Sequence, residues 1–554
     1  MKRIILVLLV FCAATINAQV TQVSGNQFGT WSGEIHLVDN VVVPDGETLN
    51  ISAGTSVISD GYFEILVLGN LSATGEENAY ITFTVADTTG YSNYDVAEAG
   101  AWKGLYFNKS GDVECRYCDF SYGKTKPSSD GGVIWISMVD GMEFANCRFH
   151  HNTTRRKGGA VYAENSSLHM HDCEVYENLA VACPPDYTWG VGLQFLKCDL
   201  DIHDMVFHDN NSETAYGGGM NIDSCNMNLK NSVFYNNNVV NAGGLGIQRC
   251  KDYNVKVSNM LAYNNKVVHY GGGLAMATSD PELNNLTIVE NYCGGGGGAG
   301  MQTAFDASPE LNNCIFWGNH AIYSFNDKDT VEYYFGSQIW LWGMDCRPVF
   351  KNSDVQYGFD SIYGKEYLTD ENYINMIDAN PLFADKYNHD YRILAGSPCI
   401  NTGVEDTIGL FIPDTDLAGG PRIFNDRIDM GCYEWNNIGL NEYFADENAV
   451  LVYPNPLNDN ALCVINLKNR CDVVLRLVSL DGKEVYRENC GTFDVGENQI
   501  PLDGMVRNVE RSNKMYLLSI ENQCVKIVYL RSSSFSILSF CLFILFMGFL
   551  RQEY

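Results

Sequence analysis

Apolar and polar residues alternate over short segments through the middle of the chain, from about Cys118 to Asn319. Met220–Ile222 and Leu274–Met276 are two such segments. Alternation with a period of two residues is typical of β-strands that bury one face. Apolar periodicity of helical length is absent from the chain. The pattern therefore predicts an all-β protein built from short strands.

A short phrase returns at nearly constant intervals along the same region. It consists of an apolar residue, two variable residues and an asparagine, with successive asparagines 26, 32, 27, 27, 27 and 28 residues apart. These asparagines are Asn152, Asn178, Asn210, Asn237, Asn264, Asn291 and Asn319. A glycine-rich phrase, such as Gly158-Gly159 or Gly218-Gly219, lies between them. Two phrases that share one period indicate a repeat solenoid.

The length of the repeat predicts the shape of each coil. About 27 residues, less the turns, leave room for three strands of ~5 residues, each ~17 Å long. Coils stacked in parallel at about 4.8 Å bury their inner faces against one another, so we predict a parallel β-helix. Gly and Asn accept the positive φ of a coil corner, and stacked Asn amides can bond along a column. We therefore assign the repeated asparagines a structural role.

Alignment of the coils on their glycine pairs sorts the side chains into inward and outward columns. It places Val133, Trp135, Ala160 and Tyr162 inside. On the outward strip beside the glycines only Asp223 is acidic. One carboxylate is too little for the two-carboxylate chemistry of a glycoside hydrolase.

The same alignment stacks cysteines in two columns. They are Cys198, Cys225 and Cys250 in one column, and Cys118, Cys147, Cys173 and Cys314 in the other. No cysteine pair accompanies a histidine pair at zinc-like spacing. We favour buried cysteines that fill the core over a metal site.

Histidines supply another candidate metal site. His169 and His171 are two residues apart on one predicted strand, so their rings lie on the same face. If His203 lies one coil further on, the three rings can hold a metal ion. The alternative is a group of exposed polar residues near the coil corners.

The 554-residue chain has a formal net charge of −31. Such a surface has no basic area to neutralise phosphates, which argues against binding to nucleic acid. It suits an extracellular protein that holds Ca²⁺, although charge locates no calcium site and no other cofactor is expected. Residues 1–18 combine a basic start, an apolar stretch and a final Ala18, which predicts a signal peptide and export.

Family resemblances refine this picture. Residues 19–110, with Gly29-Thr-Trp31 and Trp102-Lys-Gly104, resemble the opening coils of secreted right-handed β-helix proteins, and we interpret them as a cap and first coils. The repeats in residues 111–345 resemble those of chlamydial polymorphic outer-membrane proteins and of β-helix proteins of the pectate-lyase-like superfamily. The resemblance implies a right-handed parallel β-helix and names no reaction.

Residues 346–436 are similar to the "choice-of-anchor" region that follows β-helices in secreted bacterial proteins. The similarity rests on runs such as Asn380-Pro-Leu-Phe383 and Gly396-Ser-Pro-Cys-Ile400. The charged residues of this region form a candidate catalytic set: Asp416, Arg422, Asp429 and Glu434. A salt-bridged terminal cap is the alternative that we favour.

Residues 437–450 are a polar linker, and residues 451–531 have the pattern of a small β-sandwich. Tyr453-Pro-Asn-Pro456 and the Asp-Gly hairpin of Leu480–Tyr486 resemble the C-terminal sorting domain of type IX secretion substrates in Bacteroidetes. The resemblance implies passage by the type IX machinery across the outer membrane and attachment at the cell surface. The tail, residues 532–554, carries the apolar stretch Phe535–Leu550, which is a short anchor or an extension.

Two hypotheses for function follow. The first is a non-catalytic adhesin or glycan-contacting scaffold, secreted to the outer-membrane surface, with a polysaccharide or a host or neighbouring cell surface as partner. The second is a polysaccharide lyase or glycoside hydrolase that acts on acidic polysaccharide. The fold does not decide between them, because one fold hosts many functions.

Overall fold

The computed structural model describes most of the chain. The described residues are 20–126, 129–181, 188–325, 329–333, 336–343, 345–425, 427–435, 450–453, 462–467, 470–479, 483–494, 496–502, 514–520 and 524–530. The expected signal peptide, most of the linker and the apolar tail lie outside these residues. Within them no helix is long and apolar enough to cross a membrane. Two units are distinguished, residues 1–381 with 397–434, and residues 382–396 with 435–554.

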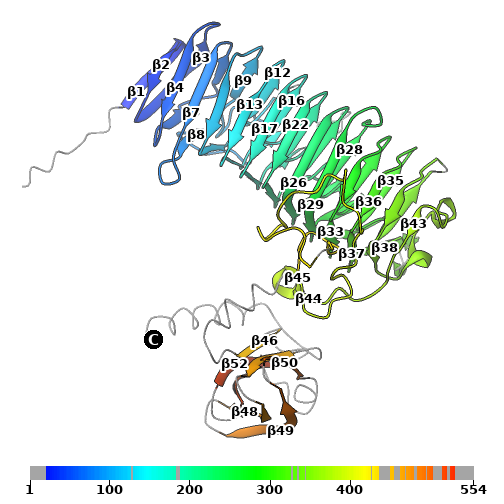
Figure 1. The fold of residues 1–554 in the computed structure, drawn as a ribbon. Helices are drawn as coiled ribbons and strands as arrows, with labels where there is room; N and C mark the ends of the chain where they lie inside the picture. Colours follow the sequence, from blue (N-terminus) through cyan, green and yellow to red (C-terminus); the bar gives the residue numbers. More distant parts are fainter. Residues whose placement is uncertain are drawn as a thin grey trace, which may run out of the picture. The chain divides into compact units, whose positions relative to one another are not determined.

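The larger unit is a parallel β-helix, as the repeat predicts. Figure 1 shows its coils stacked in sequence order, from blue at the first coil to green at the last. Each coil contributes one strand to each of three faces, and every strand pairs in parallel with its equivalent one coil away. We name these the first, second and third faces in the order in which a coil crosses them.

The strands of the first face are β6 (Glu64–Val67), β9 (Gly104–Asn108), β12 (Ile134–Ser137), β16 (Val161–Glu164), β21 (Leu193–Leu196), β25 (Met220–Asp223), β28 (Leu245–Gln248), β31 (Leu274–Ala277), β35 (Met301–Ala304) and β40 (Ile339–Trp342). Those of the second face are β2 (Gly29–Trp31), β4 (Thr48–Ser52), β7 (Asn70–Thr74), β10 (Val113–Arg116), β13 (Met142–Ala145), β17 (Ser167–His171), β22 (Asp199–His203), β32 (Glu282–Asn284), β36 (Glu310–Asn312), β41 (Val349–Lys351) and β43 (Tyr373–Ile374). Those of the third face are β5 (Ser56–Ser59), β8 (Ile81–Val85), β11 (Cys118–Ser121), β14 (Arg148–His150), β18 (Glu174–Tyr176), β23 (Val206–His208), β33 (Thr287–Val289), β37 (Ile315–Trp317) and β42 (Asp354–Val355).

Four longer strands belong to two faces each. They are β1 (Val20–Asn26) and β3 (Glu34–Val43) on the third and first faces, and β26 (Asn226–Tyr235) and β29 (Val255–Tyr263) on the second and third. Short strands line the return to the first face: β15 (Thr153–Thr154), β19 (Leu179–Ala180), β20 (Thr188–Trp189), β24 (Ala215–Tyr216), β27 (Asn238–Asn241), β30 (Lys266–Tyr270), β34 (Tyr292–Cys293), β38 (His320–Phe325) and β39 (Asp329–Tyr333). Two 3₁₀ turns follow, η1 (Phe359–Ser361) and η2 (Lys365–Tyr367).

The second unit contains three antiparallel sheets. A hairpin pairs β44 (Phe383–Asp385) with β45 (Asp390–Ile393), with η3 (Lys386–Asn388) between them. The other two sheets have three and four strands. These strands are β46 (Val450–Tyr453), β47 (Leu462–Leu467) and β50 (Gly496–Pro501), and β48 (Cys471–Ser479), β49 (Glu484–Phe493), β51 (Lys514–Ile520) and β52 (Cys524–Leu530). These two antiparallel sheets lie in the residues for which the sequence predicts a small β-sandwich.

Like side chains form files through the core of the β-helix. Phe83, Phe120 and Phe149 stack with ring centroids 4.9 and 5.2 Å apart. The cysteine columns are also internal: the main-chain N–H of Cys198 donates to Sγ of Cys225, and both residues are buried. These are the contacts expected when a polypeptide returns to the same position once per coil.

The register of the first face differs from the alignment on glycine pairs. Ile134 and Val161 occupy the column of Leu193, one residue later than the predicted Val133 and Ala160. The reason lies in the corner. The residue with positive φ comes three positions before the first inward residue of the strand, as in Gly190-Val-Gly192-Leu193. The inward placement of Trp135 and Tyr162 was therefore wrong, and both lie on the outer side.

A buried ladder of asparagines joins the coils at one corner. Asn210 donates through Nδ2 to Oδ1 of Asn237 at 2.9 Å and to the carbonyl of Val175 at 3.0 Å. Its own Oδ1 accepts two bonds from Asn178, one from the main-chain N–H and one from Nδ2. The same set of bonds recurs from coil to coil, so the ladder satisfies buried amides and fixes the spacing of the corner.

One predicted member of the ladder was wrong. Asn265, and not Asn264, bonds to Asn237 on one side and to Asn291 on the other. The phrase starts at Ala262, which lies in register with Phe234 and Ile288, whereas the larger Leu261 suggested an earlier start. Asn264 precedes the ladder and has a φ of 53°.

Removal of one rung tests the ladder. Asn210→Ala removes the acceptor of two buried N–H groups of Asn178, the main-chain N–H and one N–H of Nδ2. Each unsatisfied buried group costs about 1–3 kcal/mol, so we expect the free energy of unfolding to fall by about 3 kcal/mol or more. Equilibrium unfolding in urea measures this. Asn238→Ala, which removes an exposed amide, is the control and should shift the midpoint little; equal midpoints for the two variants would contradict the ladder's role.

The last coil buries a carboxyl group, Asp354, in β42. It accepts bonds from the N–H of Ala379 at 3.1 Å and from the thiol of Cys399 at 3.5 Å. Burial raises its pKa to about 7, further helped by the charge of Asp378. The folded state therefore favours the protonated acid, whereas the unfolded state releases the proton near pH ~3.9.

This carboxyl predicts a pH dependence of stability. Below the unfolded pKa, the protonated Asp354 adds about 4 kcal/mol to the free energy of unfolding. This stabilisation is lost as the pH rises through the folded pKa of about 7. The measurement is the difference in free energy of unfolding between wild type and Asp354→Asn from pH 4 to 8. We expect wild type to lose stability relative to the variant over that range. A constant difference would show that the carboxyl is ionised in the fold.

Candidate functional site

The candidate catalytic set of the end region is buried and surrounded by main chain. Arg422 and Glu434 form an ion pair of 3.1 Å with side chains 2 % and 0 % exposed. Both oxygens of Glu434 accept main-chain N–H groups, from Phe424 and Asp429. Asp416 accepts three main-chain N–H groups, and the carboxylate of Asp429 accepts the N–H of Asn401. The structure thus brings all four residues together, out of contact with solvent.

The segment that carries this cluster covers the flank of the β-helix. Asparagine side chains on successive coils donate to its carbonyls: Asn259 to Thr415, Asn284 to Phe411, Asn285 to Asp429 and Asn352 to Thr402. Arg422 also reaches Oδ1 of Asn259 at 3.3 Å. These bonds serve to hold residues 397–434 against the corner between the second and third faces.

The three candidate histidines meet on the outer side of the second face. His169 and His171 share β17 and point outward because they alternate with the buried Leu168 and Met170. The parallel register places His203 beside His171 on the next coil. The ring centroids of His171 and His203 are 5.0 Å apart, and Nε2 of His169 lies 3.3 Å from Nε2 of His203.

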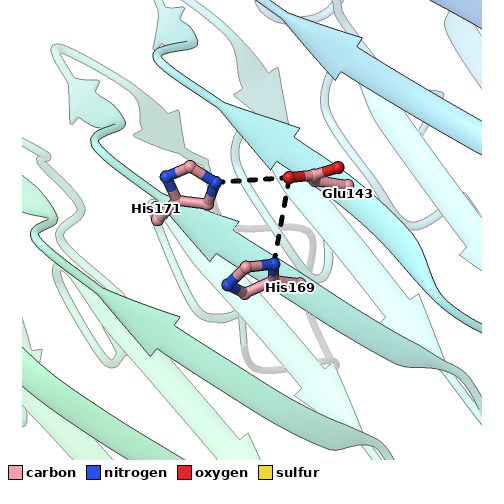
Figure 2. A group of neighbouring side chains, drawn as sticks. All are labelled: Glu143, His169 and His171. Carbon is pink, nitrogen blue, oxygen red and sulfur yellow. Dashed lines mark hydrogen bonds and ion pairs between the residues drawn. The ribbon is translucent and has the colours of Figure 1, made fainter.

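Glu143 completes the group and was missed from the sequence. It precedes His169 by one coil in the same outward column. Figure 2 shows its carboxylate beside both rings of β17, with one contact to each. Oε1 lies 3.3 Å from Nε2 of His171 and 3.9 Å from Nδ1 of His169. The signal for Glu143 in the sequence is its position one repeat before His169, in the same outward column.

The electrostatics of the group are set by its acidic neighbours. Burial by itself lowers the pKa of His171, but hydrogen bonds to Asp172 and Glu143 outweigh burial and raise it. Burial lowers the pKa of His169, and the neighbouring His171 lowers it further. Burial by itself raises the pKa of the Glu143 carboxyl, but the hydrogen bond with His171 and the charge of Arg116 outweigh burial and lower it. Arg116 donates to both oxygens of Glu143, at 3.0 and 2.9 Å.

A surface hollow of about 360 Å³ extends from His169 across the start of the second-face strands. Its apolar floor is formed by Leu168, Leu200 and Met227. The remainder is formed by Gly141 and by polar side chains from the four coils that follow it: Ser167, His169, Asp199, Asp201, Asn226, Asn228 and Asn254. Hydrogen bonds order part of this rim, such as Nδ2 of Asn226 to Oδ1 of Asp199 at 2.6 Å.

The outward strip of the first face contains more acidic residues than the alignment of the sequence predicted. The corrected register places Glu164 in the column of Asp223, two coils away. Glu164 accepts a bond from the hydroxyl of Tyr162 at 2.9 Å. Asp223 is paired through both oxygens with Arg249. The strip therefore holds two carboxylates about 10 Å apart along the axis, given a coil spacing of ~4.8 Å.

The buried ion pair of the end region can be tested for a structural role. Arg422→Met leaves the carboxylate of Glu434 buried without its counter-charge, and loss of one partner of a buried pair costs about 3–5 kcal/mol. We expect a correspondingly lower midpoint in urea unfolding. Lys251→Met, which removes a surface ion pair with Asp306, is the control and should leave the midpoint unchanged. A wild-type midpoint for Arg422→Met would argue against a structural cluster.

Comparison with known proteins gives one family match. The model of the right-handed β-helix region matches residues 74–261, about a third of the chain. No curated protein matches the sequence significantly. Among solved structures, tailspike protein 2 of Escherichia coli O157:H7 bacteriophage CAB120 is similar at 11% identity and a TM-score of 0.24. The comparison covers 94% of this chain and 65% of the tailspike, and at that TM-score it carries no argument.

The family match agrees with the parallel coils of the structure. It includes β17 and β22, which bear the histidines, and most of the strands that line the hollow. The chain therefore contains a right-handed parallel β-helix, and the candidate site lies on its outer surface.

Proposed function

We propose that this protein is a cell-surface β-helix that holds a polysaccharide on the outer side of its second face without cleaving it. The observation that carries the proposal is the hollow of about 360 Å³, where polar side chains from four successive coils surround an apolar floor. Hollows that receive ligands combine an apolar floor with a few well-placed polar groups. Leu168, Leu200 and Met227 form such a floor beneath the polar rim.

The polar side chains of the rim suit a ligand that is rich in hydroxyl groups. Asp201 and Asn228 follow one another in a single column, and Asp199 and Asn226 follow one another in the next. Carboxylates accept hydrogen bonds from hydroxyls, and amides both donate and accept, so each pair can bind adjacent sugar hydroxyls. Because the two pairs lie on neighbouring coils, a chain of sugars that runs along the axis can contact both of them.

Charge favours a neutral glycan. The protein carries a formal net charge of −31, and both carboxylates of the rim, Asp199 and Asp201, are exposed. An anionic polysaccharide would meet like charges here, whereas hydroxyls gain hydrogen bonds from carboxylates. The substrate class of the proposal therefore differs from the acidic polysaccharide considered for a lyase.

The location of the protein is part of the proposal. The basic and apolar pattern of residues 1–18 supports export, and the resemblance of residues 451–531 to type IX sorting domains supports passage through that machinery to the outer-membrane surface. A glycan-holding adhesin at that surface fits a rigid solenoid with a long exposed face.

A hydrolase is the second candidate, and one observation favours it. Glu164 and Asp223 lie in one outward column at about 10 Å, just above the ~6.5–9.5 Å separation of inverting glycosidases. Asp223, however, is held by Arg249. Release of new reducing ends from neutral polysaccharides, abolished by Glu164→Gln, would support this candidate in place of the first.

Binding to a glycan array, followed by titration of the best ligand, tests the proposal. We expect Asp201→Ala and Asn228→Ala each to weaken binding about tenfold, since a net hydrogen bond is worth about 1–1.5 kcal/mol. The intact protein should release no reducing ends from the same ligand.

Asn238→Ala serves as the matched control, because it removes an exposed amide outside the hollow. It should bind like wild type. Equal affinities for all four proteins, or no bound glycan in a broad array, would exclude the hollow as the binding site.

A further inference from the structure

We infer that Glu143, His169 and His171 form a binding site for a transition-metal ion of the Zn²⁺ type. One ligand atom from each residue lies within 4.8 Å of the other two. Two imidazole nitrogens and a carboxylate oxygen are the ligands of many zinc sites with three protein ligands. The inference does not depend on the proposed glycan binding.

The separations are close to those that an ion requires. Ligand atoms about 2.0–2.2 Å from a tetrahedral Zn²⁺ lie roughly 3.3–3.5 Å from one another. Nε2 of His171 is 3.3 Å from Oε1 of Glu143, which already meets this distance. Nδ1 of His169 is 3.9 Å from the same oxygen, and its ring is exposed enough to rotate towards the other two ligand atoms, which lie within 4.8 Å.

Neighbouring carboxylates fix the protonation of two histidines. Oδ2 of Asp172 lies 2.7 Å from Nδ1 of His171, and Oδ2 of Asp204 lies 2.7 Å from Nδ1 of His203. A carboxylate acceptor holds a proton on Nδ1, so Nε2 carries the lone pair when the ring is neutral. Carboxylate–histidine pairs of this kind orient the ligands of metal sites and raise their basicity.

His203 in turn sets the protonation of His169. With its Nδ1 on Asp204, a neutral His203 can accept the Nε2 proton of His169 across the 3.3 Å between the two Nε2 atoms. Oδ2 of Asp201, 3.8 Å from Nε2 of His169, favours a proton there too. Nδ1 of His169 then carries the lone pair that faces Glu143. His203, which the sequence suggested as a ligand, is therefore a positioning residue.

The resulting arrangement directs three electron pairs at one place. The lone pairs of His169 and His171 and a carboxylate oxygen of Glu143 face one another, which is repulsive unless a cation lies between them. Arg116 offsets part of the charge of Glu143 from the far side. A proton on His171 is the competing solution, and a metal ion satisfies all three groups at once.

The site is open on one side. The side chains of His169, His171 and Glu143 are 41 %, 17 % and 23 % exposed, so an ion can enter without unfolding. Three protein ligands leave a fourth position for water or another oxygen ligand. His169 also lines the hollow, so the ion would lie at its edge.

Calorimetric titration of the chelator-treated, full-length protein with ZnCl₂ tests the inference. We expect wild type to bind one Zn²⁺ ion per chain. We expect His171→Ala and Glu143→Ala to bind none. Asp172→Asn, which changes only the orienting partner, should weaken binding about 10–100-fold. Co²⁺ in place of Zn²⁺ should give the visible absorption of a tetrahedral site, and that absorption should vanish in His171→Ala.

His208 provides a matched control. It lies on the third face with the same local arrangement, Nδ1 being 2.7 Å from Oδ2 of Asp209, but its ring stacks between Tyr176 and Tyr235. His208→Ala should bind Zn²⁺ like wild type, and thermal melting without metal should show that every variant is folded. Zn²⁺ binding that is unchanged in folded His171→Ala, or no binding by wild type, would overturn the inference. Glycan binding measured with chelator present separates this result from the proposed function.

Discussion

The structure depends on in-register hydrogen bonding between the main chains of successive coils. Each strand of a coil donates to and accepts from its equivalents above and below, as in the column of Met142, Leu168 and Leu200. This pairing sets the separation of the coils and forces equivalent side chains into files. An inward file must be apolar or fully hydrogen-bonded, because it has no access to water. An outward file carries no such requirement, and the candidate sites lie there.

The sequence was sufficient to predict the coil but not the exact position of each residue in it. A period near 27 and the alternation of apolar residues predicted the faces, since both follow directly from the geometry of stacked strands. The errors came from ambiguous corners. Leu261 and Ala262 are both apolar, and only the pairing of Ala262 with Phe234 shows which one enters the core. Likewise a run of glycines does not reveal which of them takes the positive φ, so Trp135 was placed on the wrong side.

The residues of the candidate sites also fall into those that the sequence predicts and those that it does not. His169 and His171 were predicted to share a face because strand alternation is a local property. Their approach to His203 required only the repeat. Glu143 and the orienting Asp172 were not predicted, although Glu143 lies one repeat before His169 and Asp172 directly follows His171. The hollow could not be foreseen, since its shape depends on how far each side chain of five coils stands out from the surface.

The buried charges of the end region show how an added segment packs against the β-helix without disturbing its repeat. Asparagines at the corner between the second and third faces take a positive φ and keep their amides free to donate sideways. Asn259 and Asn285 use them to bind the main chain of residues 397–434. That segment then needs charges of its own, because its chain reversals bury N–H groups that no strand can accept. Asp416 and Glu434 accept them, and Arg422 neutralises Glu434. The charged residues that most resemble a catalytic set thus bond to the main chain of the segment that covers the flank, whereas the coils leave other polar groups facing water.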